Sequence, residues 1–355
     1  MTTISAVHNG AITSVRPHLR HVWRLSTPLG LYEHCDRTRP RVEHGFCTDD
    51  SARLLVLAAR EPVDRFTETL AERSIRFLEQ AHRNGGRFAN RRAPDGQWLD
   101  NGEEDDSCGR ALWGLGAATS SMLSDDLRAR AADLFEMGAG FRSRHLRSTA
   151  FAVLGAGALL AGRPSSFPAR TLIADAARLC RHLVDGAGAS AWRRRWPWPE
   201  ERLTYANAAI PEMVIIAGHE SGDERLARRG ADLLRWLVDT ETGPAGWLSV
   251  TPAGGWSLGE QRPAFDQQPI EVAALADAAA TAARLDGDGS WREVVDRCAR
   301  WFLGRNDIGA PMVDWATGGG FDGLTPFGPN LNEGAESTIA AITTMQHARR
   351  MLHLS

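Results

Sequence analysis

The sequence predicts an all-α protein in which six helical hairpins close into a ring, an (α/α)6 barrel. The first observation is an alternation along the chain: segments rich in Ala, Leu and Gly with few charges are followed by amphipathic segments with many arginines and acids. Helices that are apolar on all sides are enclosed, whereas helices with one polar face lie outside. The second observation is that this alternation repeats six times, which indicates hairpin units that bury their apolar faces only against each other.

The repeating units place every predicted helix. Inner helices are expected at about 49–60, 106–122, 147–161, 203–219, 267–284 and 333–352, and outer helices at about 63–83, 125–141, 168–185, 222–240 and 289–304. Residues 1–40, with a short helix from Arg16 to Leu25, are expected to supply the sixth outer element. The unequal repeats favour a closed ring over an open solenoid, which would show uniform repeats and polar caps. We therefore predict one catalytic domain over residues 1–355, with 1–40 closing the ring.

The connections between the predicted helices differ in length. Links from an inner helix to the next outer helix are short, whereas most links from an outer to an inner helix are long. In such a ring all outer-to-inner links lie at one end, together with the N-termini of the inner helices. Long loops in a compact domain are usually functional. We therefore expect the functional site at this end of the barrel, which we call the mouth.

The composition narrows the class of protein. A formal net charge of -3 with 43% hydrophobic and 24% charged residues is typical of a globular protein and gives no electrostatic footprint for nucleic acid. No apolar run is long enough to span a membrane, and the first residues lack a signal-peptide pattern. The five cysteines are scattered without a CxxC pair, which favours reduced thiols in a cytoplasmic protein. The oligomeric state is not predicted.

A loop-to-helix stretch at residues 41–55 contains the first candidate site. Thr48 is expected to cap a helix whose first turn carries Asp49 and Asp50, where the helix dipole favours negative charge. Arg53 follows Asp50 by three residues and shares its helix face. Acids at a helix N-terminus commonly serve only as caps. They recur, however, at most of the predicted inner-helix starts, which indicates a shared role at the mouth.

The mouth gathers side chains that suit carbohydrate. The long loops and helix starts contribute carboxylates, amides and tryptophans, among them Glu103, Glu104, Asp105, Asp106, Asp266, Glu333, Glu336, Asn207, Gln267, Gln268, Trp98, Trp192, Trp196, Trp198, Trp247, Trp256 and Trp315. Concave sites of this kind fit sugar rings and their hydroxyl groups. Glycoside cleavage needs two carboxyl groups, one of them protonated as the acid. An alternative interpretation is that the tryptophans simply pin the long loops in place.

Other chemistries have no motif in the sequence. There is no HExxH, no paired Cys/His spacing, no GxSxG and no Walker A loop. We therefore predict neither a metal nor an organic cofactor.

Six motifs extend over most of the chain: His44–Arg53, Asp105–Trp113, Trp196–Trp198, Leu203–Tyr205, Phe265–Glu271 and Asn332–Thr338. Together they resemble a bacterial family of (α/α)6-barrel proteins that are often labelled glycosyltransferases and are akin to six-hairpin glycosidases. Within this family the chain is most similar to mycobacterial-type methylmannose polysaccharide hydrolases, which are endo-acting α-1,4-mannosidases. The resemblance implies carbohydrate-active chemistry at the mouth, on an oligo- or polysaccharide substrate.

The combined prediction is an inverting glycoside hydrolase. We expect Asp266 and either Asp50 or Asp49 to form the acid and base pair, with Asp50 favoured because Asp49 can act as a capping partner. Glu336 and Asp105 are reserve candidates. The groups expected to bind or orient substrate are His44, Arg53, Asp105, Trp198, Tyr205, Asn207, Trp256, Gln268 and Glu336.

One departure from the family lies after the Leu203–Tyr205 motif. Relatives commonly carry an Asp and an Arg flanking Asn207, where this chain has Ala206 and Ala209. A substrate with fewer free hydroxyl groups, such as an O-methylated sugar, would need fewer polar contacts there.

Two other classes stay open. Enzymes similar to N-acylglucosamine 2-epimerase share the barrel but use histidine acid and base groups, and of the histidines only His44 is clearly expected at the mouth. A noncatalytic glycan-binding protein would tolerate loss of the paired carboxylates.

Overall fold

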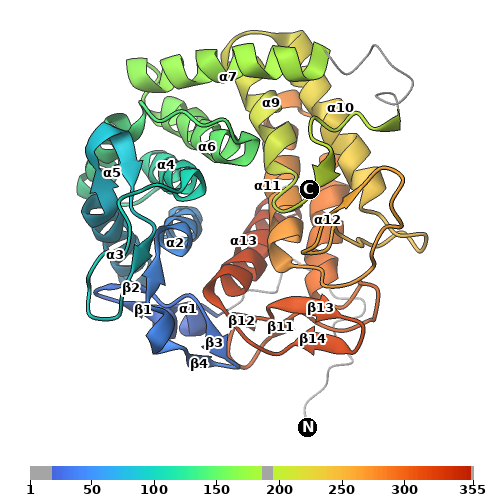
Figure 1. The fold of residues 1–355 in the computed structure, drawn as a ribbon, viewed down its shortest axis with the longest axis horizontal. Helices are drawn as coiled ribbons and strands as arrows, with labels where there is room; N and C mark the ends of the chain where they lie inside the picture. Colours follow the sequence, from blue (N-terminus) through green and yellow to red (C-terminus); the bar gives the residue numbers. More distant parts are fainter. Residues whose placement is uncertain (1–17, 186–194, 353–355) are drawn as a thin grey trace.

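Six helices surround a central axis in the computed structural model, which describes residues 18–185 and 195–352 (Figure 1). These inner helices are α2 (Thr48–Arg60), α4 (Asp105–Thr119), α6 (Leu146–Gly162), α9 (Ala209–Glu220), α11 (Pro269–Asp286) and α13 (Ala335–Leu352). Each packs against the next, and α13 packs against α2. The ring is therefore closed, which confirms the predicted (α/α)6 barrel.

The outer helices pack on this ring from outside. They are α3 (Arg65–Ala81), α5 (Asp125–Gly138), α7 (Phe167–Asp185), α10 (Glu224–Thr240) and α12 (Trp291–Phe302), and each contacts the inner helix that precedes it. The sixth outer position is taken by the short helix α1 (Arg20–Leu25), which lies against α13. This helix is shorter than predicted because it begins at Arg20, and Arg16 lies outside the described residues.

Small residues let the inner helices α4 and α6 touch through their backbones. A Cβ atom on Gly116 would lie 2.0 Å from the carbonyl oxygen of Gly155, and one on Gly155 would lie 2.1 Å from the carbonyl oxygen of Leu112. Neither oxygen can move aside, because each belongs to a helix backbone that is fixed within the ring. The two glycines therefore set how closely these helices approach.

The Gly116→Ala variant is expected to lower the free energy of unfolding by roughly 1–3 kcal/mol, the usual cost of overpacking a filled interior. This loss outweighs the higher helix propensity of alanine. Chemical denaturation followed by circular dichroism measures the change. Gly140→Ala is the matched control, because no atom lies within 4 Å of the Cβ that it adds. Equal stability of the two variants would contradict the backbone contact between α4 and α6.

The long connections gather where the inner helices begin. They cover residues 82–104, 241–268 and 303–334, and short antiparallel strand pairs and two 3-10 turns, at Val42–His44 and Asn84–Gly86, shape this end. The pairs are β1 (Ser26–Thr27) with β2 (Gly30–Leu31), β3 (Cys35–Asp36) with β4 (Arg39–Pro40), β5 (Phe46–Cys47) with β8 (Arg91–Arg92), β6 (His82–Arg83) with β7 (Arg87–Phe88), β9 (Arg202–Leu203) with β10 (Trp256–Ser257), β11 (Val313–Asp314) with β12 (Gly319–Gly320) and β13 (Gly323–Thr325) with β14 (Gly328–Asn330). The mouth is therefore built as the connection lengths predict.

Two predicted helix starts are wrong in detail. Thr48 does not cap α2: its hydroxyl donates to the Ala89 carbonyl at 2.6 Å, and the thiol of Cys47 accepts from the backbone N–H of Asp50 instead. The fourth inner helix was expected from residue 203, but α9 begins at Ala209. The preceding residues form strand β9 and a turn, in which the Asn207 side chain accepts from the backbone of Thr204.

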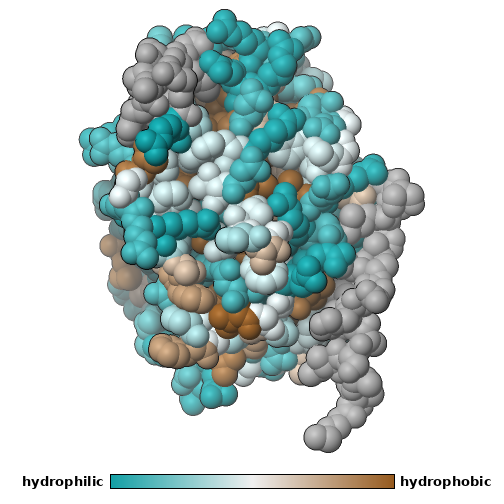
Figure 2. All heavy atoms as spheres, turned by 90° about the vertical axis from the view of Figure 1, so that its right-hand side faces the viewer, coloured by the Kyte–Doolittle hydropathy of each residue, from teal (hydrophilic) through white to brown (hydrophobic). Residues whose placement is uncertain are grey.

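Figure 2 shows the face on the side of α10 and α12, where side chains are mainly hydrophilic and hydrophobic side chains form only small scattered areas. Among the described helices, none combines the length and the apolar character needed to cross a lipid bilayer. The five cysteines are all buried free thiols. This agrees with the prediction from the cysteine pattern.

Candidate active site at the barrel mouth

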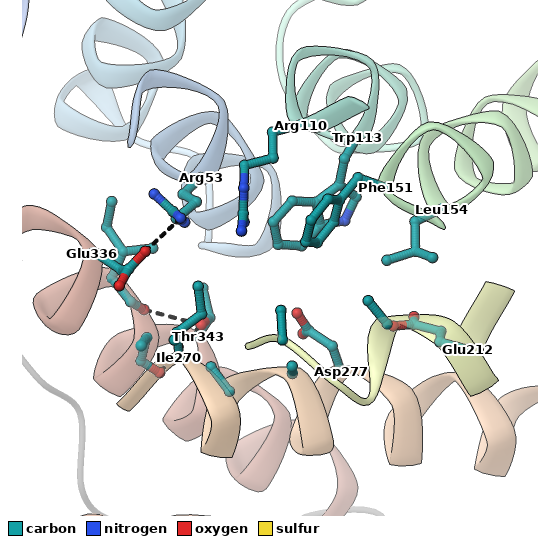
Figure 3. A pocket seen from close by; sticks show the side chains of 16 residues that line it. Arg53, Arg110, Trp113, Phe151, Leu154, Glu212, Ile270, Asp277, Glu336 and Thr343 are labelled. Carbon is teal, nitrogen blue, oxygen red and sulfur yellow. Dashed lines mark hydrogen bonds and ion pairs between the residues drawn. The ribbon is translucent and has the colours of Figure 1, made fainter. Parts of the chain in front are cut away.

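A narrow axial cavity lies between the inner helices (Figure 3). Most of its wall is apolar and consists of Trp113, Phe151, Leu154, Ala206, Ala209, Ile270, Ala273, Ala274, Ile339 and Ala340. Charged side chains occupy its two ends: Arg53, Arg110 and Glu336 at one, and Glu212 and Asp277 at the other. The cavity therefore combines an apolar middle with two separate groups of carboxyl side chains.

Asp50 is enclosed at the start of α2. Its side chain accepts hydrogen bonds from Arg53 at 2.6 Å and from the thiol of Cys47 at 3.3 Å. Burial raises the pKa of Asp50 to about 6, although Arg53 acts in the opposite direction. Arg53 also forms an ion pair at 2.5 Å with Glu336 of α13. The predicted contact between Arg53 and Asp50 is confirmed, and Glu336 joins it from the far end of the sequence.

Two further carboxyl groups, Asp49 and Asp106, lie beside Arg110. The Arg110 Nε atom lies 3.9 Å from Asp49 Oδ1 and donates to Asp106 Oδ2 at 3.1 Å. The side chains of Asp49 and Asp106 are 22% and 25% exposed, against 2% for Asp50. Asp49 and Asp106 are therefore partly exposed, and Asp106 lines the groove at the mouth, whereas Asp50 is closed off.

The pKa values of these two acids shift in opposite directions. Burial raises the pKa of Asp49, and the Asp49 Oδ1 atom has no hydrogen-bond partner among the described residues. Burial would also raise the pKa of Asp106, but the Arg110 guanidinium and the Tyr205 hydroxyl group hold it below its usual value. Asp49 thus tends to keep a proton under conditions where Asp106 is ionised.

The segment Tyr205–Asn207 forms a rim at the edge of the axial cavity. Ala206 has a left-handed backbone conformation (φ 44°), which costs a non-glycine residue about 1–3 kcal/mol. The buried carboxyl group of Glu271 stabilises this conformation, because it accepts hydrogen bonds from the backbone N–H groups of Ala206 and Asn207. Arg147 donates to the Asn207 side chain at 2.9 Å. Asn207, which was predicted to bind or orient substrate, is therefore buried and holds the rim in place.

The opposite end of the cavity holds a second pair of carboxyl groups. Asp277 accepts hydrogen bonds from Arg60 and His347, both at 2.6 Å, and Glu212 accepts one from Thr281 at 2.6 Å. Burial, together with the charge of Asp277, raises the pKa of Glu212 to about 8. Burial acts in the same direction on Asp277, but Arg60 and His347 keep the pKa of that carboxyl low. This pair forms a polar floor.

A groove at the mouth lies next to the axial cavity. Its lining comprises Glu103, Glu104, Asp105, Asp106, Arg144, His145, Leu146, Arg147, Ser148, Glu200 and Tyr205. The predicted substrate-binding residue Asp105 lies here, where its side chain accepts hydrogen bonds from Arg87 at 2.7 Å and Ser143 at 2.6 Å. Tyr205 is 38% exposed in the same groove.

Eight of the predicted site residues line neither this groove nor the axial cavity: Asp49, Asp50, His44, Trp198, Asn207, Trp256, Asp266 and Gln268. Asp266 is exposed with a left-handed backbone (φ 66°), and its carbonyl accepts from the backbone of Ala253 at 3.0 Å. His44 is exposed and packs edge-on against His34. Gln268 precedes α11 without a capping hydrogen bond from its side chain. The catalytic role of Asp266 therefore stays a prediction without a supporting contact to either space.

The tryptophans of the long loops mainly pack the loops together. Trp196 and Trp198 are 1% and 0% exposed, and both rings contact Trp236 of α10. Trp256 is partly buried and packs edge-on against Trp196. The prediction that Trp198 contacts substrate is corrected accordingly, because a fully enclosed ring offers no face to a sugar. Trp192 lies outside the described residues.

One group of side chains has the composition of a metal site. Ligand atoms of Glu33, Cys47 and Asp50 lie within 4.8 Å of one another. Both carboxylates already have an arginine partner, since Arg91 pairs with Glu33 and Arg53 with Asp50. Burial also raises the pKa of the Cys47 thiol well above its usual range, which disfavours the thiolate that a metal would bind. We therefore interpret the cluster as part of the packing around Asp50.

Three residues of the site were not nominated from the sequence as catalytic or binding groups: Asp106, Arg110 and Arg147. A signal for the first two was present. Asp106 and Arg110 stand four residues apart at the start of α4, which repeats the acid-then-arginine order of Asp50 and Arg53 at the start of α2. Arg147 gave no such signal, because its partners Glu200 and Asn207 lie more than fifty residues away in sequence.

Comparison with known proteins shows a shared fold. No protein-family model matches the chain, and no curated protein matches it. Cellobiose 2-epimerase from Spirochaeta thermophila aligns with a TM-score of 0.67 and 14% identity over 95% of this chain and 94% of that chain. A D-mannose isomerase aligns with a TM-score of 0.63 and 12% identity, covering 95% and 97%. The GH76 α-mannanase of Bacteroides thetaiotaomicron aligns with a TM-score of 0.56 and 11% identity, covering 91% and 90%. The chain therefore has the barrel fold found in these sugar-processing enzymes.

Proposed function

We propose that the protein is a glycoside hydrolase that cleaves α-mannosidic chains internally, with inversion at the anomeric carbon. The observation that carries the proposal is the pair Asp49 and Asp106, which lie beside Arg110 at the mouth with their pKa values shifted apart. Acid–base cleavage of a glycosidic bond requires one protonated and one ionised carboxyl group. The fold supports the proposal, because glycoside hydrolases and other sugar-processing enzymes share it.

In the proposed mechanism Asp49 is the general acid and Asp106 the general base. Asp49 donates its proton to the glycosidic oxygen as the bond from that oxygen to the anomeric carbon breaks. Asp106 takes a proton from a water molecule, whose oxygen bonds to the anomeric carbon from the opposite face. Arg110, Ser148 and Tyr205 all donate hydrogen bonds to Asp106.

Asp50, which was favoured over Asp49 for the predicted acid and base pair, has a positioning role in this proposal. It is too enclosed to touch substrate, but it fixes Arg53, and Arg53 in turn fixes Glu336 beside the cavity. Glu336 keeps 37% of its side chain exposed and remains available to sugar hydroxyl groups.

The apolar wall of the axial cavity favours a substrate that carries apolar substituents. Ala206 and Ala209, which stand where relatives carry charged side chains, both line the cavity beside Phe151, Ile270 and Trp113. An apolar wall leaves sugar hydroxyl groups without hydrogen-bond partners, which is costly, whereas O-methyl groups fit it well. We propose O-methylated α-1,4-mannan as the substrate for this reason and because of the family resemblance.

The epimerase alternative is less well supported by the cavity. Of the described residues that line it, none is a histidine. His145 lines the groove instead, and His347 is already hydrogen-bonded to Asp277 at the floor. An acid and base pair of histidines therefore has no place around the apolar middle of the cavity.

Incubation with a panel of α-mannans and O-methylated mannosides, read by NMR for the anomer first formed, tests the proposed function. We expect shorter fragments whose new reducing ends have the inverted configuration. A change at C2 without shorter fragments would indicate an epimerase. Binding without any product would indicate a glycan-binding protein.

The pH profile of turnover follows from the two shifted pKa values. Activity should fall as the pH rises through the raised pKa of Asp49, because the acid then loses its proton before catalysis. It should also fall as the pH drops through the lowered pKa of Asp106, because the base becomes protonated. Measured kcat/KM values should form a bell, and Asp49→Asn should remove its alkaline limb. A variant that loses the acid limb instead would reverse the two assignments.

A further inference from the structure

A second pocket lies at the end of the barrel away from the mouth, where the inner helices end. All six inner helices and the link from α4 to α5 contribute to it. We call it the basal pocket, and its lining includes Arg60, Met122, Ala161, Glu220, Arg284 and Arg350. None of these six residues lines the axial cavity or the groove at the mouth, so the proposed hydrolysis leaves the basal pocket without a role.

The polar floor separates the basal pocket from the axial cavity. Glu212 lines both spaces, whereas Asp277 lines only the axial cavity and its hydrogen-bond partner His347 only the basal pocket. Figure 3 shows Glu212 and Asp277 at the end of the axial cavity that faces away from Arg53. A ligand in the basal pocket would therefore lie on the far side of the floor from the proposed catalytic groups.

The basal pocket offers apolar surface to a ligand. Small side chains such as Ala117, Ala158 and Ala280 line it and leave space between the helix ends. Met122 lines it as well and is 85% exposed. A ligand with an apolar part could therefore cover surface that water now contacts, which favours binding.

The charged side chains of the basal pocket leave an excess of positive charge. Arg60 is paired with Asp277 at 2.6 Å, but Arg284 and Arg350 form no ion pair with any residue in the described ranges 18–185 and 195–352. Burial raises the pKa of Glu212 to about 8, so this carboxyl group keeps its proton at neutral pH. Glu220 is the one other acid of the lining, and it contacts His219 at 3.3 Å.

Arg350 lies close to other arginines without a counter-ion of its own. Its guanidinium donates a hydrogen bond to the backbone carbonyl of Arg60. Burial and the charge of Arg60 lower the pKa of Arg350, because both disfavour its charged form. The neighbouring carboxylate of Glu61 is already paired with Arg349 at 2.8 Å. An anion beside Arg350 would offset this repulsion.

Helix capping is another explanation for arginines at this end of the barrel. The C-termini of helices attract positive charge, and Arg350 does cap α2 through the carbonyl of Arg60. Arg284 makes no such side-chain hydrogen bond within the described part of the chain, although it lies in the last turn of α11. Capping therefore explains the position of Arg350 but not why both guanidinium groups face one pocket.

We propose that the basal pocket binds a small organic anion, whose charge pairs with Arg284 and Arg350 and whose apolar part contacts the surrounding alanine and methionine side chains. Arginine forms strong hydrogen bonds with carboxylate and phosphate groups. The apolar wall favours a carboxylate on a hydrocarbon or aromatic body over inorganic phosphate. This site is separate from the mouth and does not depend on the proposed hydrolysis.

Calorimetric titration of the whole protein with benzoate tests the site, at low ionic strength so that salt does not screen the charges. Benzoate should bind at least about tenfold more tightly than benzyl alcohol, which lacks the charge, and than inorganic phosphate, which lacks the ring. The double variant Arg284→Met/Arg350→Met should lower the affinity for benzoate by at least about tenfold. Arg292→Met is the matched control, because this exposed arginine lies on the outer helix α12 and should leave the affinity unchanged.

A second variant keeps both arginines and fills the pocket instead. Ala161 is exposed at the end of α6 and lines the basal pocket, so Ala161→Trp should exclude benzoate without removing a charge. Thermal melts check that each variant is folded. If the double arginine variant does not fold, the result with Ala161→Trp decides.

Several results would overturn the proposal. These are no benzoate binding by the wild-type protein, binding that survives both the arginine variant and Ala161→Trp, and equal affinity for phosphate and benzoate. Displacement of benzoate by an α-mannan would place it in the axial cavity and would also overturn the proposal. Benzoate binding that depends on Arg284 and Arg350, in a protein that cleaves no mannan, would support the basal site while rejecting the proposed function.

Discussion

The Asp49→Asn variant is expected to keep less than about one hundredth of wild-type turnover, since general acid catalysis contributes roughly 10²–10⁴-fold. Asparagine has nearly the same shape as aspartate but cannot release a proton to the leaving oxygen. The melting temperature should change little, because the only ion pair of Asp49 among the described residues is the 3.9 Å contact with Arg110, and Arg110 keeps Asp106 as its closer partner at 3.1 Å. Initial rates on an α-mannan and a thermal melt measure the two effects.

A substrate with a better leaving group tests directly whether Asp49 is the proton donor. A nitrophenyl glycoside needs little protonation of its leaving oxygen, so Asp49→Asn should slow its cleavage far less than that of a mannan. Two matched variants serve as controls: Glu212→Gln removes the floor carboxyl group whose pKa is raised, and Asp266→Asn removes a carboxylate that the sequence predicted for the acid and base pair. A larger loss in either control than in Asp49→Asn would move the proton donor to that residue.

Replacing Arg53 by methionine is expected to lower the free energy of unfolding by about 3–5 kcal/mol, the usual cost of leaving one partner of a buried ion pair alone. Arg53 is 10% exposed at its side chain and serves both Asp50 and Glu336. Methionine keeps most of the volume and supplies no charge. Urea denaturation at several pH values measures the loss.

The destabilisation should grow as the pH rises. Without Arg53, the folded-state pKa of Asp50 rises further above the unfolded value, so the folded protein binds a proton more tightly than the unfolded chain does. Stability is then greatest below the unfolded pKa and is lost as the pH rises towards the folded one. The double variant Arg53→Met/Asp50→Asn should recover part of the loss at neutral pH. Equal losses in the single and double variants would show that the buried charge is not the cause.

The ring could be predicted from the sequence because the inner helices can be recognised from their local apolar composition. Apolar runs such as Phe151–Leu160 differ plainly from the arginine-rich outer helices, and connection lengths assign the mouth. The grouping of Asp49, Asp50 and Arg53 could be predicted for the same reason, since one helical turn places them together.

The rest of the site depends on contacts that no local pattern contains. Tyr205 bonds to Asp106 only because the rim between β9 and α9 bends over the start of α4, and that bend relies on buried Glu271 from a third helix. The enclosure of Trp198 also depends on a residue that is distant in sequence, because Trp236 of the outer helix α10 covers its ring. Loop residues lack a periodic spacing that would reveal which of them are enclosed.

The last inner helix meets the first, and this has a consequence for the order of assembly. The ion pair of Arg53 with Glu336, like the hydrogen bond from Gln346 to the Leu57 carbonyl, joins segments that are nearly the whole chain apart. Such long-range contacts form late, because the entropy of bringing the segments together must be overcome first. Recovery of activity during refolding would therefore report the final step of assembly, and a nascent chain would remain inactive until its C-terminal helix had docked.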